Sequence, residues 1–192
     1  MSTGGRREVV FEFPLSETLT VSFQRYPCPA AGVVSALPRS WGALPVAETG
    51  PRELAVPVPE GEAVWLGLRA TAEARRWRLA VVAHLDPGGP TDAVTGLSAR
   101  VPDDLAVLVV PPRRQLEGIA RPDGGWWALT RVATALGAPS CRGLEILTAP
   151  DGAPRERLIR VRLTEPGDFA ADTGGDVPPL RADASYGGWR LP

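Results

Sequence analysis

Turn-forming residues divide this chain into short segments. Its 192 residues include 21 glycines and 21 prolines, which recur along most of the length. Proline lacks the backbone donor that the interior of a helix needs, and glycine weakens helices, so the segments between them do not support long helices. A helical bundle and a coiled coil are thereby excluded, and the length is typical of one domain.

Many of the segments between these residues alternate apolar and polar side chains, which is typical of half-buried strands. The alternation is clearest at 9–15 and 19–23, and the short link between these two segments favours a hairpin. The segment 105–110 is apolar throughout, as in a strand covered on both faces, and Pro111 ends it. We predict further strands at 52–57, 62–69, 77–85, 115–120, 126–131, 144–149 and 158–163.

Two of the links between predicted strands have the same turn chemistry. The sequence Pro-Asp-Gly occurs at 122–124 and again at 150–152. Proline presets φ for a turn, aspartate bonds nearby backbone, and glycine accepts a positive φ. Each link therefore predicts a hairpin between the two strands that flank it. After the strand at 126–131, a short helix or a loop is expected to end at Gly137.

The fold class that follows is mainly β: a single-domain β-sandwich or a small β-barrel of about nine to ten short strands, formed by residues 1–163. Residues 26–50 contain four prolines and predict a proline-rich arm loop that covers the domain. Pro57 predicts that the strand at 52–57 lies at a sheet edge.

The last part of the chain has a different composition. Residues 164–192 are rich in Gly, Pro and Asp, and they predict an irregular C-terminal tail. We expect this tail to pack on the domain or on a partner, with Tyr186 and Trp189 as its anchors.

The charge of the chain excludes several functions. Its 22 acidic residues balance 21 basic ones, and the net charge is −1, whereas proteins that bind nucleic acid usually carry a basic face. We therefore predict no nucleic-acid partner. The chain contains no lysine, so it cannot form a lysine Schiff base. The lack of lysine and asparagine is typical of a GC-rich, actinobacterial-like genome.

Two observations bear on location. The chain has no run of 18 apolar residues, so we predict no membrane span. Residues 1–8 are short and polar and lack the apolar core of a secretory signal, which predicts a cytoplasmic protein.

Three residues are candidates for catalysis. His84 is the only histidine, so a Ser–His or Cys–His pair would have to use it, with Asp86 as a neighbour. An exposed or structural histidine is the alternative. Glu62 and Glu117 lie in predicted strands, and a carboxylate drawn into an apolar cavity could act as an acid. Solvation at the strand end is the alternative for Glu62.

The sequence predicts no metal and no cofactor. Cys28, Cys141 and His84 do not have the spacing of zinc ligands, and two cysteines do not make a disulfide scaffold. The aspartates of the tail do not match a calcium loop, and the chain lacks a Walker A motif and a G-x-G-x-x-G motif.

Tryptophans and arginines are the candidates for ligand or partner binding. Trp126 and Trp127 point to opposite faces if they lie on a strand, so one of them would be exposed or would line a cavity. Trp65 belongs to the same aromatic set, and exposed tryptophans are common at partner contacts. Arg113 and Arg114 form the candidate basic patch, with solvated strand ends as the alternative.

Several motifs together resemble an uncharacterised family of bacterial and fungal all-β proteins. They are EAVWLGL at 62–68, DAVTGL at 92–97, PPRRQLEGI at 111–119, ALG at 135–137 and RGLEIL at 142–147. The family pattern has an E-A-x-W strand, an N-A-V-[TS]-G turn, a W-L-D-G-I segment and a G-G-[LI]-Q strand. The similarity covers roughly residues 10–150 and implies an architecture but no reaction. The chain departs from the family at 115–118, which reads QLEG, and at 127–137.

Three hypotheses of function follow. The first is a non-enzymatic binding or assembly module of a bacterial cytoplasmic complex, with a protein partner or a second copy of the chain. The second is a small β-barrel that binds an apolar small molecule, or acts on it by shape as a cofactor-free cyclase. The third is a His84-dependent hydrolase or transferase. An apolar cavity of several hundred Å³ lined by tryptophans would favour the second.

Overall fold

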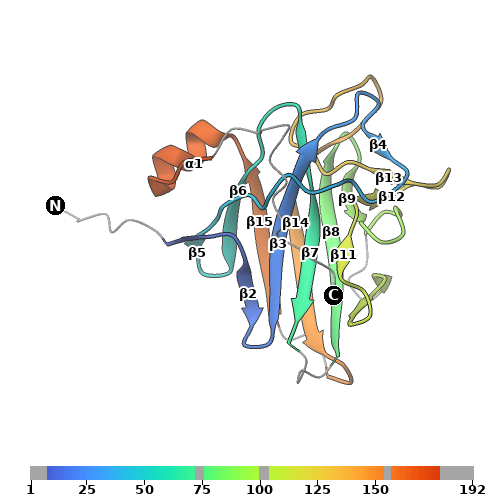
Figure 1. Cartoon of the computed structure of the whole chain (residues 1–192). Helices are drawn as coiled ribbons and strands as arrows, with labels where there is room; N and C mark the ends of the chain where they lie inside the picture. Colours follow the sequence, from blue (N-terminus) through green and yellow to red (C-terminus); the bar gives the residue numbers. More distant parts are fainter. Residues whose placement is uncertain (1–7, 72–75, 100–103, 154–156, 178–192) are drawn as a thin grey trace.

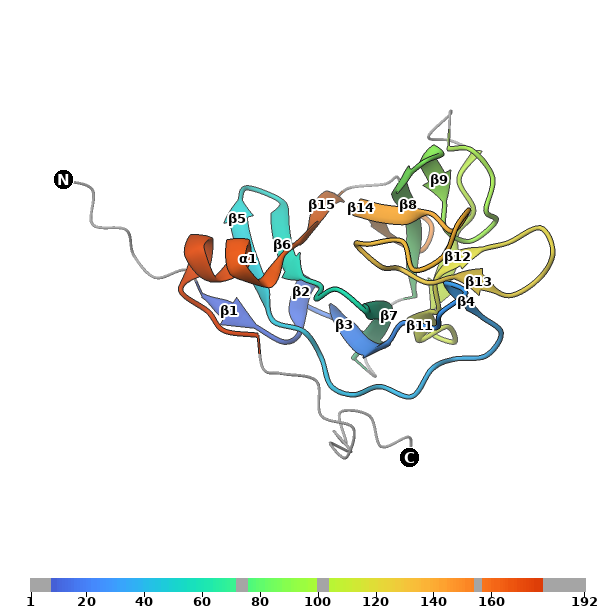
Figure 2. The same ribbon diagram turned by 90° about the horizontal axis from the view of Figure 1, so that it is seen from above.

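The computed structural model describes residues 8–71, 76–99, 104–153 and 157–177. Two layers of β-sheet face each other, and Figure 2 shows them edge-on as two rows of strands. The prediction of a mainly β, sandwich-like fold is confirmed, and in the described residues the sheets do not close into a barrel. Among these residues, ten strands have three or more residues and five have two.

The larger layer is an eight-stranded sheet in the order β1-β5-β6-β15-β14-β8-β10, with β9 paired to β8 (Figure 1). Its hairpin β14–β15 is the one predicted around the turn at 150–152, and β8 pairs with the other side of β14. The strands are Val9–Val10 (β1), Val46–Gly50 (β5), Glu53–Pro57 (β6), Trp77–Asp86 (β8), Gly89–Asp92 (β9), Leu108–Val110 (β10), Ser140–Pro150 (β14) and Arg157–Thr164 (β15).

The smaller layer is a four-stranded sheet in the order β11-β7-β3-β2. Its strands are Phe13–Ser16 (β2), Leu19–Pro27 (β3), Glu62–Ala70 (β7) and Gln115–Leu116 (β11). The N-terminal hairpin predicted from alternation is formed by β2 and β3. A third sheet joins Val33–Val34 (β4), Ile119–Ala120 (β12) and Trp126–Trp127 (β13), and it contains the second predicted hairpin.

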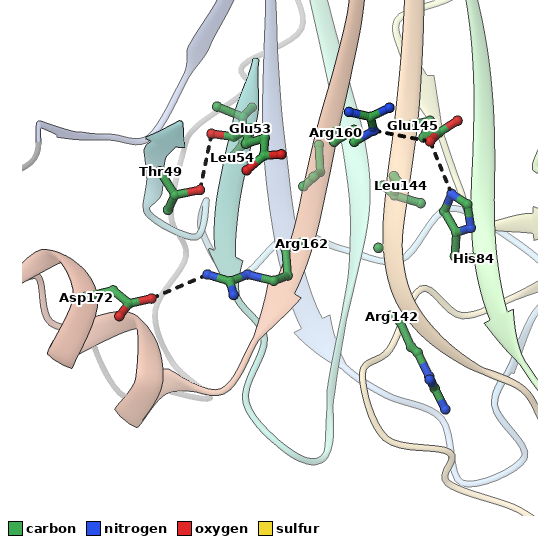
Figure 3. A pocket seen from close by; sticks show the side chains of 12 residues that line it. Thr49, Glu53, Leu54, His84, Arg142, Leu144, Glu145, Arg160, Arg162 and Asp172 are labelled. Carbon is green, nitrogen blue, oxygen red and sulfur yellow. Dashed lines mark hydrogen bonds and ion pairs between the residues drawn. The ribbon is translucent and has the colours of Figure 1, made fainter. Parts of the chain in front are cut away.

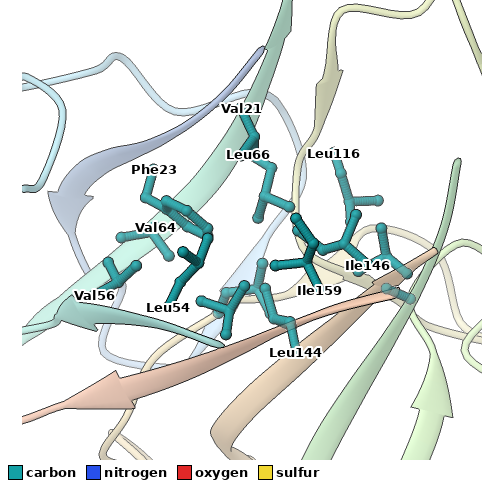
Figure 4. Close-up of a cluster of buried hydrophobic side chains, with 14 of the residues drawn as sticks. Val21, Phe23, Leu54, Val56, Val64, Leu66, Leu116, Leu144, Ile146 and Ile159 are labelled. Carbon is teal, nitrogen blue, oxygen red and sulfur yellow. The ribbon is translucent and has the colours of Figure 1, made fainter. Parts of the chain in front are cut away.

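The main core lies between the two large sheets, as Figure 4 shows. Alternate residues of each strand enter it, which is what the period of two in the sequence requires. Strand β3 gives Leu19, Val21 and Phe23, and β14 gives Leu144 and Ile146, all buried. Large aliphatic side chains therefore occupy the space between the layers.

The structure corrects several predictions about single segments. Strand β6 is not at an edge, because it pairs with β5 on one side and with β15 on the other. Its Pro57 is the last residue of the strand, so the missing donor leaves the ladder intact. The 105–110 segment forms a strand only at Leu108–Val110, at the sheet edge rather than at its centre. The arm at 26–50 contains β4 and β5, and β3 extends into its first two residues.

The tail is not irregular at its start. Pro166–Thr173 forms a helix, α1, with proline in the first turn and Gly174 at the C-cap. Phe169 of this helix is fully buried against Ala47 of β5 and Ala55 of β6. The predicted anchors Tyr186 and Trp189 lie outside the described residues. Among the described residues we find no helix with the length and apolar character needed to cross a membrane.

Candidate functional site

The candidate site is a trough on the outer face of the eight-stranded sheet, the face turned away from the core (Figure 3). It has a volume of about 530 Å³ and is open to solvent. Helix α1 lies at one side of it, and Leu54, Leu144 and Val161 contribute to its floor. Its charged and ionisable side chains come from β6, β8, β14, β15 and α1: Glu53, His84, Arg142, Glu145, Arg160, Arg162 and Asp172. We call this hollow the outer trough.

Strand register brings these side chains into rows. Glu53 of β6 is opposite Arg160 of β15, and Arg160 is opposite Glu145 of β14. In the next row, Arg162 and His84 flank Gly143 from the two sides. Directly opposed residues have side chains on the same face of the sheet, so one face carries charges of alternating sign across three strands.

A β-bulge shapes the centre of the outer trough. The register between β14 and β8 shifts between Cys141 and Gly143, so one extra residue, Arg142, lies on β14. Cys141 is buried, whereas the side chain of Arg142 is 74% exposed and pairs with Asp86. At Gly143 there is no room for a larger residue, because an added Cβ would lie 2.5 Å from the carbonyl oxygen of Val161. Because of the bulge, the side chain of Arg142 points to solvent, and the next residue, Gly143, has no side chain.

Ion pairs connect the side chains of the outer trough. Glu145 Oε1 lies 3.5 Å from Arg160 Nε and 3.7 Å from His84 Nε2, and Asp172 Oδ2 lies 3.4 Å from Arg162 Nη2. The arginine side chains are about three-fifths exposed. Water therefore screens these pairs, and each contributes little to stability. The charged side chains can therefore leave these ion pairs and bind the charged groups of a partner instead.

A second hollow continues the outer trough along α1. It shares Arg142, Arg162 and Asp172 with the first and extends to Arg131 and Glu165, whose nearest charged atoms are 4.0 Å apart. The two hollows together form one surface depression beside the helix. This arrangement was not predicted, because α1 and the strand register were both needed to find it.

His84 lies in the outer trough, but its surroundings differ from the prediction. Its closest acidic partner is Glu145, whereas Asp86 pairs with Arg142. No serine or cysteine is among the residues that line the outer trough. Cys141 is on the core side of the sheet, where burial raises the pKa of its thiol to about 12. A Cys–His pair between these two residues is therefore ruled out by their opposite faces.

Glu62 is buried and does not lie at a solvated strand end. Its carboxylate accepts hydrogen bonds from the guanidinium of Arg25, at 2.7 Å from Nε and 2.5 Å from Nη2. Its backbone carbonyl accepts a bond from Thr130 Oγ1 at 2.8 Å. A carboxylate paired in this way is a structural group, and the outer trough does not contain it.

Glu117, Arg113 and Arg114 lie away from the outer trough. Arg113 Nη1 is 3.8 Å from Glu117 Oε1, and the side chain of Arg113 is 60% exposed while that of Glu117 is 11% exposed. The carbonyl of Arg114 accepts the backbone N–H of Leu68 and so joins this loop to β7. These three residues are near one another, but the structure does not bring them to the other candidates.

The tryptophans mainly serve packing. Trp126 and Trp127 do point to opposite faces, as predicted: Trp127 packs on the main core and Trp126 on a smaller cluster with Trp65 and Tyr26. The guanidinium of Arg121 lies 4.5 Å from the ring centre of Trp127. Three hollows of about 530–700 Å³ on the described surface are open to solvent, and no tryptophan lines them.

Motif residues from the family resemblance have structural roles. Asp92 accepts backbone N–H bonds from Val94 at 2.8 Å and from Ala106 at 2.7 Å. At Gly96, an added Cβ would lie 2.1 Å from the carbonyl oxygen of Ala120. The turn at 92–97 is therefore held by backbone hydrogen bonds to the Asp92 carboxylate and lies against the backbone of β12. Among the described residues, no group of three or more His, Cys, Asp or Glu could hold a metal ion.

No protein-family model, curated protein or solved structure matches this chain. The resemblance to the bacterial and fungal family stays a hypothesis.

Proposed function

We propose that this chain is a non-enzymatic binding module and that it holds a protein partner against the outer trough. The observation that carries the proposal is the uncovered strip of charged side chains on β6, β15, β14 and β8. On either side of it the same sheet face is covered, by Phe169 of α1 over β5 and β6 and by Leu105 over Ala80 and Val82 of β8. Among the residues that the structure describes, no side chain covers the strip, which leaves this part of the face for a partner.

The chemistry of the strip favours a protein with a mixed-charge surface. Three arginines stand beside Glu53, Glu145 and Asp172, so the outer trough has no net charge when His84 is neutral. Guanidinium groups bind carboxylates through paired hydrogen bonds, and the carboxylates of the strip would receive basic groups. Charges of alternating sign fit a partner surface in one position only. They therefore contribute more to the specificity of binding than to its affinity.

The other two hypotheses have less support. The Trp-lined apolar cavity that a small apolar ligand would require is not among the three large hollows. The hydrolase hypothesis needs a nucleophile beside His84, and the only hydroxyl among the lining residues, that of Thr49, donates to the carbonyl of Glu53 at 3.4 Å. We therefore give preference to binding.

The test reverses two charges of the strip in the full chain. Arg160→Glu with Arg162→Glu should weaken partner capture, because both positions would then repel the partner carboxylates that the arginines are proposed to bind. Arg114→Glu, outside the outer trough, is the matched control. Tagged proteins are purified from cells of the source organism and the retained proteins are quantified, and sedimentation gives the mass of each variant.

The expected result is a protein retained by the wild type and the control but about tenfold less by the double variant, a loss of about 1.4 kcal/mol. A homo-oligomer that dissociates only in the double variant would identify the partner as a second copy. Equal retention and equal mass for all three proteins would show that the outer trough binds no protein partner.

A further inference from the structure

A second open hollow lies at the edge of the sandwich, away from the outer trough. It is formed where β1 and β5, at one edge of the large sheet, face β2, at the edge of the small sheet. Its volume is about 700 Å³, and its lining residues include Val10, Phe13, Pro14 and Val46. We call it the edge groove, and the views in Figures 1 and 2 place these strands together at one side of the molecule.

The edge groove combines an apolar floor with an acidic rim. Glu8, Glu17 and Glu48 line it and are exposed. Arg157 is the one basic residue among those that line it, and its Nη1 donates to the carbonyl of Leu15 at 2.7 Å. The rim therefore carries an excess of negative charge, and an occupant with basic and large apolar side chains would complement it.

The described chain ends at the rim of the edge groove. After the C-cap Gly174, an added Cβ on Gly175 would be only 3.1 Å from Cγ2 of Val9. Val177 packs against both the main core and the cluster that contains Val9 and Phe169. Val9 stands between Glu8 and Val10, two residues of the edge groove. The chain that follows Val177 therefore starts next to this hollow.

The residues that follow have the side chains the edge groove would select. The segment 178–192 contains Tyr186 and Trp189, together with Arg181 and Arg190 and a single acidic residue, Asp183. Fifteen residues can span up to about 50 Å when extended, so reach does not limit docking. Tryptophan has the largest apolar surface to bury, and Val10 and Pro14 are the accessible apolar residues of the floor.

We propose that residues 178–192 dock in the edge groove of their own chain. The aromatic rings of Tyr186 and Trp189 cover the apolar floor, and Arg181 and Arg190 face the carboxylates of the rim. This inference does not depend on the outer trough or on the proposed partner.

The test uses the full chain labelled with 5-fluorotryptophan and observed by ¹⁹F NMR. The variant Trp189→Phe assigns the signal of Trp189 among the six tryptophans. Docking predicts that this signal differs from its position in urea. Glu17→Arg with Glu48→Arg should return it to that position, whereas Glu60→Arg, an exposed carboxylate outside the edge groove, should leave it unchanged. The other five signals report whether each variant is folded.

Trypsin cleavage after Arg181 gives an independent measurement. Cleavage follows the population of the undocked segment, so it should become about tenfold faster in the Glu17→Arg, Glu48→Arg variant than in the wild type and in Glu60→Arg. A Trp189 signal already at its urea position in the wild type would overturn the proposal, and so would unchanged cleavage in the double variant. If dilution of the protein removes the protection of Arg181 from trypsin, the edge groove binds residues 178–192 of a second copy. That result would overturn docking within one chain.

Discussion

Arg25 and Glu62 form a two-pronged ion pair inside the sandwich, with side chains only 5% and 8% exposed. Both residues lie on the core-facing side of the β3–β7 ladder, where the neighbouring positions are Phe23 and Val64. Burial removes the hydration of both charged groups, which costs free energy. The ion pair between them offsets that cost, so the loss of one group destabilises the fold.

We expect Glu62→Ala to lower the free energy of unfolding by about 3–5 kcal/mol, since the buried guanidinium of Arg25 loses the carboxylate that now accepts two of its hydrogen bonds. The double variant Arg25→Met, Glu62→Leu removes both charges and should be more stable than Glu62→Ala. Urea unfolding of the two variants and the wild type checks this. A double variant that is less stable than Glu62→Ala would mean that the pair does not dominate the energetics of this site.

Gly143→Ala tests the bulge beneath the outer trough. The new methyl group would meet the carbonyl oxygen of Val161, so β14 and β15 have to move apart, and we expect a loss of about 1–3 kcal/mol. Gly167→Ala is the control, because Gly167 has open space around its Cβ position and lies in α1, where alanine is preferred. Thermal unfolding should therefore separate the two variants in opposite directions. Equal melting temperatures would contradict the close approach at Gly143.

Phe169→Ala tests how α1 is held on the sheet. Phe169 is fully buried against Ala47 and Ala55, and its removal should cost about 3–5 kcal/mol or release the helix locally. Phe11→Ala is the matched control, because Phe11 is 51% exposed and its loss should change stability by less than about 0.5 kcal/mol. Hydrogen exchange of residues 166–173 measures the local effect. Unchanged protection there would show that Phe169 does not anchor α1.

Stability should fall at alkaline pH because of Cys141. Burial raises the pKa of this thiol from 9.0 to about 12, so both states keep the proton at neutral pH. Above pH 9 the unfolded chain releases the proton while the folded chain retains it, and the free energy of unfolding decreases by up to about 1.4 kcal/mol per pH unit. Burial also raises the pKa of Tyr26, which acts in the same direction.

Cys141→Ala should reduce this alkaline slope, although the variant is less stable at neutral pH because of the lost sulfur atom. Denaturant unfolding between pH 8 and pH 10.5 gives the slope for each protein. Identical slopes in the wild type and in Cys141→Ala would show that the buried thiol does not titrate between the two states.

Local sequence signals were enough for most of the long strands and for two of the hairpin turns. The alternation in Leu19, Val21 and Phe23 identifies a strand and its core face, and the Pro-Asp-Gly turns identify two hairpins, because both signals act within a few residues. The start of α1 could also have been found, since Pro166 and Gly174 are typical boundary residues of a helix. The high content of Gly, Pro and Asp in residues 164–192 concealed it.

Register between distant strands could not be predicted. Glu53, Glu145 and Arg160 share one row of the outer trough because β6, β14 and β15 are neighbours, and nothing near these residues in the sequence specifies that. The same reason explains the partner of His84: Asp86 is close in sequence, but Glu145 is on the adjacent strand. For Glu62 the sequence left a catalytic acid and a solvated strand end as alternatives, and it did not indicate the ion pair because Arg25 is 37 positions away.

The parallel pairing of β6 with β15 has a consequence for how the molecule folds. All other strand pairs of the described residues are antiparallel, and these two strands are about a hundred residues apart along the chain. In the described residues, β1, β5 and β6 are joined to the rest of the large sheet through this pairing. Sequence-distant contacts of this kind slow folding. Joining the two parts of the large sheet therefore requires the closure of a loop of about a hundred residues, and the entropy cost of that closure falls on this one strand pair.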